Sequence, residues 1–145
     1  SDWSSDVCSS DQTKIPDGIS HIAFKLGVDS IDNVSGAMSG ALDPMNGMFW
    51  AWNTGYINIK IEGFGGLCTD PRKEFQYHIG GYLPPFATCR IIELNIPQRE
   101  QIEIKFDVAP LLEAAGYPTH THIMSAGKTS VHIADTLIST FSVTP

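Results

Sequence analysis

The clearest alternation of apolar and polar residues in this chain is Tyr56-Ile57-Asn58-Ile59-Lys60-Ile61-Glu62. Side chains on a β-strand point alternately to its two faces, so the three isoleucines share one face and the polar residues share the other. A strand with one apolar and one polar face is buried on one side only, which is typical of antiparallel sheets. This stretch therefore predicts an antiparallel β domain.

Other segments alternate in the same way and are predicted as strands. They are residues 20–26, 74–79, 89–96 and 101–108. The connection between the last two has the length of a hairpin loop, so we expect these two strands to pair.

Two segments are predicted to contain helix. Residues 108–115 follow Asp107, which can cap a helix, and precede Gly116, which can end one. Residues 134–140 are expected to add a helical turn before a last strand at 141–143. The predicted fold class is all-β, an antiparallel β-sandwich with one or two short helices.

Composition limits the function classes. The 145 residues have the length of one domain, and no run approaches the roughly 20 apolar residues that cross a bilayer. The formal charge is −7, with no basic cluster, so we expect no nucleic-acid partner. The sequence has neither a Gly-x-Ser-x-Gly elbow nor a His-Glu-x-x-His pair, so we expect no enzyme activity.

The first residues differ in composition from the rest of the chain. They are rich in Ser and Asp and lack the charged start and apolar stretch of a signal peptide. The run resembles a translated sequencing adapter, and a natural Ser/Asp linker is the alternative. We expect residues 1–12 to be a non-native or disordered segment and residues 13–145 to form the domain.

A tryptophan-rich segment, Gly47-Met48-Phe49-Trp50-Ala51-Trp52-Asn53, follows the turn dipeptide Asn46-Gly47. In an extended run, Trp50 and Trp52 would point to the same face. The two indoles could then form a wedge in the core, which their residue type favours, or an exposed aromatic platform.

Three segments carry information beyond the types of residue that they contain. They are Leu26-Gly-Val-Asp-Ser-Ile-Asp-Asn-Val, Gly47-Met-Phe-Trp-Ala-Trp-Asn-Thr-Gly-Tyr56 and Phe75-Gln-Tyr-His-Ile-Gly-Gly81. In residue identity, order and spacing, these segments closely resemble the sequences of the MbnP-like family, which are bacterial periplasmic copper-binding proteins with a Trp-x-Trp motif.

The resemblance implies a β domain that binds copper, as Cu(I) or Cu(II), in the periplasm or at the outer membrane. It also implies that the N-terminal part of the family domain and its export signal are missing here. The implied partner is a MauG-like dihaem protein of the cytochrome c peroxidase type. In relatives that partner oxidises a tryptophan to kynurenine, so Trp50 or Trp52 would be a substrate.

Three histidines are the candidate copper ligands, because imidazole suits copper. His78 falls on the polar face of its strand and resembles the histidine of the family pattern Phe-x-x-His-hydrophobic-Gly-Gly. A surface histidine bonded to a neighbouring strand is the alternative. His120 and His122 flank one residue and would face the same way in an extended loop, although a solvated polar loop would look the same.

The expected state of the cysteines depends on the implied export. Two cysteines in an exported domain are more often bridged than metal-bound, so we expect a disulfide between Cys68 and Cys89. The alternative function is a carbohydrate-binding or adhesive β-sandwich in which Trp50 and Trp52, with Tyr56, stack on sugar rings.

Overall fold

A computed structural model describes residues 15–53 and 55–145, so the predicted non-native segment 1–12 lies outside the described residues. The elements in chain order are β1 (His21–Leu26), α1 (Ser30–Val34), β2 (Ile57–Phe64), β3 (Glu74–Gly80), β4 (Arg90–Asn95), β5 (Ile104–Phe106), α2 (Ala109–Ala115), β6 (His122–Ile123), α3 (Lys128–Leu137) and β7 (Phe141–Val143). Two single turns of 3-10 helix, Gly40–Leu42 and Pro44–Asn46, lie between α1 and β2.

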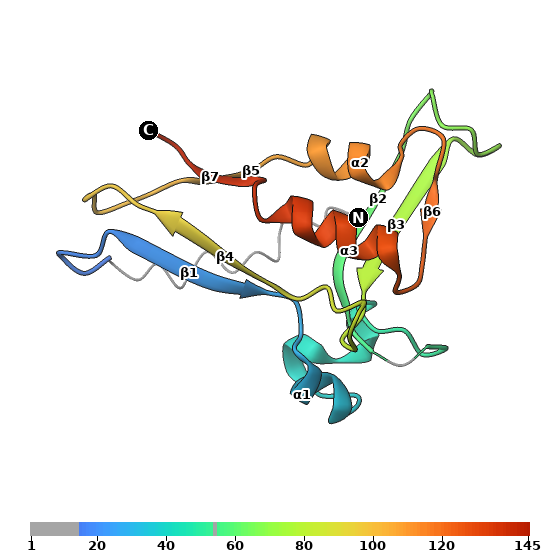
Figure 1. Ribbon diagram of the computed structural model, residues 1–145, viewed down its shortest axis with the longest axis horizontal. Coiled ribbons are helices and arrows are strands. Elements are labelled where there is room, and N and C mark those ends of the chain that lie inside the picture. Colours follow the sequence, from blue (N-terminus) through green and yellow to red (C-terminus); the bar gives the residue numbers. More distant parts are fainter. Residues whose placement is uncertain (1–14, 54) are drawn as a thin grey trace.

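The strands of the described residues form three small sheets (Figure 1). Strand β1 pairs with β4 and β5 pairs with β7, both antiparallel. The third sheet has the order β2-β3-β6, with β2 antiparallel and β6 parallel to β3. The molecule is thus rich in antiparallel strands with few short helices and is consistent with a small β-sandwich, so the predicted fold class is confirmed.

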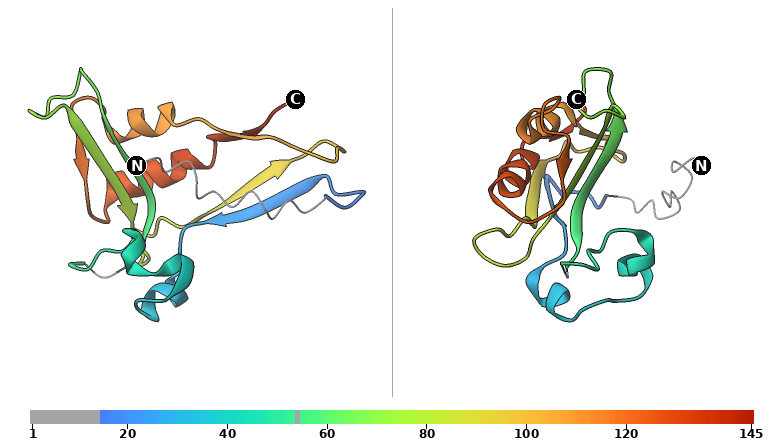
Figure 2. Two further views of the ribbon diagram at one scale, coloured as in Figure 1. Left: turned by 180° about the vertical axis from the view of Figure 1, so that it is seen from behind. Right: turned by 90° about the vertical axis from the view of Figure 1, so that its right-hand side faces the viewer.

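The core lies between the sheets and the two C-terminal helices. Helices α2 and α3 lie side by side against one face of the β2-β3-β6 sheet (Figure 2). That face carries the alternating apolar residues predicted from the sequence, and burying each such side chain contributes roughly 1.5–3 kcal/mol. The buried core residues are Ile59, Tyr77, Ile79, Ile92, Leu94, Leu111, Ala115, Ile133 and Leu137.

The predicted hairpin between the fourth and fifth strands is wrong. Strand β4 pairs instead with β1, with Phe24 opposite Ile92, and this register places apolar side chains of both strands against the core. Strand β5 is short and exposed along its whole length and pairs with β7. A connection of hairpin length permits pairing, but burial of apolar side chains decides which strands pair.

The helices also differ from the prediction. Helix α3 begins at Lys128, six residues before the predicted turn, because Ser130, Ile133, Ala134 and Leu137 form one buried helical stripe. Helix α1 was not predicted. Helix α2 ends as predicted at Gly116, which is left-handed with φ 87°. None of the helices in the described part of the chain is long and apolar enough to cross a membrane.

Candidate functional site

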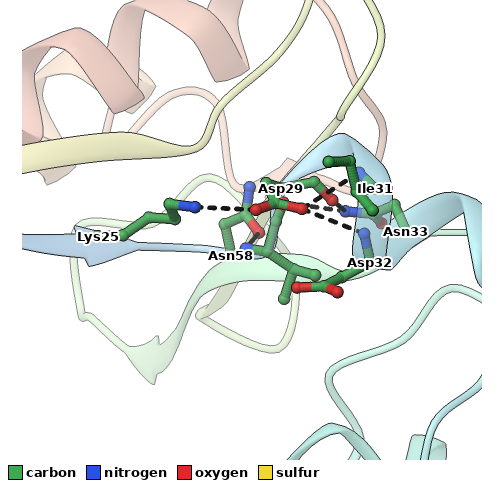
Figure 3. A network of polar contacts seen from close by, with 7 residues as sticks. Lys25, Asp29, Ile31, Asp32, Asn33 and Asn58 are labelled. Carbon is green, nitrogen blue, oxygen red and sulfur yellow. Dashed lines mark hydrogen bonds and ion pairs between the residues drawn. The ribbon is translucent and has the colours of Figure 1, made fainter.

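The loop after β1 is organised around the carboxylate of Asp29. Its Oδ1 accepts hydrogen bonds from the backbone N–H of Ile31 and of Asp32, both at 3.1 Å, which caps the start of α1. The Nζ of Lys25 lies 2.8 Å from the other oxygen (Figure 3). The hydrogen bond from Lys25, followed by the one from the Asp32 backbone, lowers the pKa of Asp29 below its usual value.

Asn33 ties this loop to the tryptophan segment. The side chain is buried, and its Nδ2 donates to the carbonyls of Val28 and Asp29 at 2.9 and 2.8 Å. Its Oδ1 accepts from the backbone N–H of Tyr56 at 2.8 Å. Both N–H groups and the oxygen of the amide are thus hydrogen-bonded, so Asn33 fixes the position of Tyr56, the residue that precedes β2.

Asn58 continues the same network into β2 (Figure 3). Its Oδ1 accepts from the backbone N–H of Val28 at 2.9 Å, and its Nδ2 donates to Oγ1 of Thr88 at 2.8 Å. The sequence prediction missed both asparagines. The one available signal was the Asp29 capping pattern, which indicates where α1 begins but not what the amides reach.

The tryptophan segment is a tight turn that leads into β2. The backbone N–H of Trp50 donates to the carbonyl of Gly55, and that of Ile57 donates to the carbonyl of Met48, both at 2.9 Å. Residues 51–53 form the turn. The assumption of an extended run is therefore wrong.

Burial separates the two tryptophans. Trp50 is 4% exposed and Trp52 is 65% exposed, with their ring centroids 5.8 Å apart. Tyr56 is also buried, at 2% exposure. The core wedge expected of both indoles therefore holds for Trp50 and is wrong for Trp52. The sugar-binding platform of Trp50, Trp52 and Tyr56 is not formed either, because only Trp52 among these three is open to solvent.

The packing of the Trp50 side chain depends on Gly80. A Cβ at Gly80 would lie 2.9 Å from the Trp50 ring and 2.7 Å from the carbonyl oxygen of Tyr56, so the indole packs directly on the backbone of β3. The Trp50 Nε1–H is buried and has no hydrogen-bond partner among the described residues. Part of the ring also borders a cavity of ≈ 410 Å³ that Tyr82 and Phe86 help to line.

His78 lies in the middle of β3, opposite Lys60 of β2. It points away from the core face, as the alternation predicted, but only 8% of the residue is exposed. Its Nε2 lies 2.7 Å from Oε1 of Glu62. The hydrogen bond from His78 lowers the pKa of Glu62, so the carboxylate is ionised and the imidazole Nε2 carries the donated proton.

The other two candidate histidines have different surroundings. His122 is in β6, opposite Gln76 in the parallel register, and therefore on the same sheet face as His78. His120 precedes β6 and packs against the end of α2, since its Nδ1 would lie 2.6 Å from a Cβ placed at Gly116. In the described part of the chain, no group of three or more His, Cys, Asp or Glu side chains is close enough to hold a metal ion.

The predicted disulfide is absent, because Cys68 and Cys89 are both free. Cys68 is buried in the loop after β2, whereas Cys89 follows Thr88, which bonds to Asn58 near the start of that strand. The six residue-to-residue steps from Asn58 to Phe64, the end of β2, span about 20 Å. The Cα atoms of a disulfide are usually less than about 7 Å apart, so the two ends of β2 keep the cysteines separate.

In a comparison with protein families, the MbnP family model matches residues 4–132. The chain belongs to the MbnP family. Membership in MbnP confirms the resemblance of the Trp-x-Trp segment and its neighbours, and it associates the protein with the methanobactin-related copper-binding family. No curated protein and no solved structure matches the chain.

Proposed function

We propose that this MbnP protein binds copper, as Cu(I) or Cu(II), in the bacterial periplasm. The observation that carries the proposal is the family match over residues 4–132, joined to the placement of His78. The same family implies a dihaem partner of the MauG-like cytochrome c peroxidase type. In this proposal the MbnP chain is a binding protein and a substrate of its partner, not a catalyst.

The pairing of His78 with Glu62 suits a metal-binding histidine. In a neutral imidazole, an Nε2–H that donates to a carboxylate leaves the lone pair on Nδ1. A carboxylate that holds the second nitrogen in this way orients the ring and raises its basicity as a ligand. No hydrogen bond to Nδ1 of His78 is present among the described residues, and the burial of the ring limits its rotation.

The described residues do not complete a copper site by themselves. His78 and His122 share a sheet face, and His120 lies against α2. Within the described ranges, no group of three or more His, Cys, Asp or Glu side chains could hold a metal ion. We therefore propose His78 as the principal ligand, with His122 as the second and His120 as the weaker alternative.

Copper titration of single variants tests this assignment. Under competition with a chelator, His78→Ala should lower the affinity at least about tenfold, since even loss of a second-shell partner costs about 10–100-fold. His122→Ala should have a smaller effect. His132→Ala is the matched control, because His132 is exposed on α3. Equal affinity in the wild type and in His78→Ala would exclude His78 as a ligand.

Exposure supports different roles for the tryptophans in the proposed modification. Trp52 is the indole that a protein partner can touch, and Trp50 lies behind it at 5.8 Å between ring centroids. Formation of kynurenine would add two oxygen atoms, delivered by the dihaem partner from two molecules of hydrogen peroxide, which are reduced to water. The C2–C3 bond of the indole is cleaved to give N-formylkynurenine, and hydrolysis then releases C2 as formate. Either indole can be the final site, since an electron can pass between rings this close.

Peptide mass spectrometry after co-expression with the partner tests the modification. We expect kynurenine at Trp50 or Trp52 in the wild type, and less of it at position 50 in Trp52→Phe if the exposed ring relays the oxidation. An unmodified peptide beside a partner that oxidises other substrates would contradict the modification without affecting the copper titration.

A further inference from the structure

One edge of β5 has no strand beside it in the described residues, where β5 pairs only with β7. The carbonyl of Glu103 accepts from Thr144 and the N–H of Asp107 donates to Thr140, both at 2.9 Å. Odd-numbered residues therefore turn their backbone groups toward β7. In an antiparallel strand the intervening residues turn theirs the other way, so the N–H and C=O of Ile104 and Phe106 point to the open edge.

The side chains of this strand alternate as regularly as its backbone groups. Ile104 and Phe106 are 39% and 47% exposed on one face, and the Phe106 ring stacks on Phe141 at 4.9 Å. Glu103 and Lys105 are exposed on the other face, and the side chain of neither makes a hydrogen bond or ion pair within the described ranges. An open edge with exposed apolar residues is a template for another strand.

We propose that the open edge of β5 pairs antiparallel with β5 of a second copy of this chain. The backbone groups that point outward belong to even-numbered residues, so even residues must face even residues. With Ile104 opposite Ile104 of the second copy, Glu103 lies opposite Lys105, and the symmetry repeats this pair. Both opposite-charge pairs then fall at positions without backbone hydrogen bonds, where facing side chains are closest.

The charges select this register over its neighbours. Sliding one strand by two residues in one direction places Glu103 opposite Glu103. Sliding it in the other direction places Lys105 opposite Lys105 and Glu103 opposite Asp107. Like charges directly opposite each other are destabilising. The charged face therefore blocks both neighbouring registers and is self-complementary in the central one.

The pairing is expected to be weak and reversible. A short strand pair buries little area, and each copy carries a formal charge of −7, so the two copies repel at long range. Physiological salt screens this repulsion over about 8 Å. We expect a dissociation constant between about 1 µM and 1 mM. The pairing is independent of copper, so the failure of either proposal leaves the other standing.

Sedimentation equilibrium of charge-reversal variants tests the register. The wild type should dimerise reversibly, and Glu103→Lys and Lys105→Glu should each weaken the dimer at least about tenfold, because two attractive pairs become repulsive. The double variant Glu103→Lys with Lys105→Glu should restore the wild-type constant, since it exchanges the two charges. Glu93→Lys and Lys128→Glu, both at exposed positions away from β5, are the controls for net charge.

Three results would overturn the proposal. They are a wild type that stays monomeric up to about 1 mM, a dimer that survives both single reversals, and a double variant that stays as weak as the single ones. The second result would show that the copies meet at another surface. Circular dichroism of each variant checks that it folds, which is expected because Glu103 and Lys105 are exposed.

Discussion

The tryptophan turn and the His78 site are held in place by opposite means. Neutral amides hold the turn: Asn33 and Asn58 bind backbone groups of two segments that are far apart in the sequence. One charge-assisted contact holds His78, to a Glu62 side chain that is 44% exposed. Neutral buried hydrogen bonds are insensitive to pH and costly to break, whereas a hydrogen bond to a half-exposed carboxylate is weaker and depends on the charge of that carboxylate.

Replacement of Asn33 should break the tryptophan turn most strongly. Asn33→Ala removes three hydrogen bonds and leaves the buried backbone N–H of Tyr56 without a partner. Loss of a buried partner costs about 1–3 kcal/mol, so we expect the free energy of unfolding to fall by about 2–4 kcal/mol in urea titrations. Asn95→Ala, at an exposed position of β4, is the control and should change stability by less than about 0.5 kcal/mol. Equal stability of the two variants would show that the amide network does not hold the turn.

The two regions also differ in how much of their structure could be predicted from the sequence. The alternation in residues 56–62 and 74–79 correctly assigned the faces of β2 and β3, because the period of a strand is a local property. The alternation correctly placed His78 on the sheet face that points away from the core. It could not show that the Glu62 side chain lies against the His78 ring. The turn at residues 51–53 was missed, since it depends on contacts such as that of Asn33 with Tyr56, 23 residues away. Register between strands and side-chain contacts over such distances are not encoded in any local period.

A Cβ at position 80 should sharpen the contrast by disturbing the packing around Trp50. In Gly80→Ala the new carbon meets the carbonyl of Tyr56 and the Trp50 ring, so one of them must shift. Overpacking of this kind costs about 1–3 kcal/mol, and we expect a change in tryptophan emission as the ring moves. Gly66→Ala is the matched control, because nothing lies within 4 Å of a Cβ there. If Gly80→Ala leaves both stability and emission unchanged, Trp50 does not pack on β3 as described.

The smallest expected effect concerns the pH dependence of the His78 site. The pKa of Glu62 is lowered in the folded state, first by its hydrogen bond with His78. A lowered pKa means that the ionised carboxylate stabilises the fold at pH values above its ordinary pKa of 4.5, and that this contribution is lost as the pH falls through the lower folded pKa. Glu62→Gln lacks the contribution at every pH.

The difference in unfolding free energy between the wild type and Glu62→Gln should therefore be largest near neutral pH and should shrink as the solution becomes more acidic. Every other carboxylate, including Asp29, titrates in both proteins, so the comparison isolates Glu62. The effect is small because the side chain is 44% exposed and solvent screens the pair. A difference that stays constant between about pH 7 and pH 3 would mean that the charge on Glu62 does not hold His78. The ring would then owe its position to burial alone, and the tryptophan turn and the histidine site would be held by the same kind of force.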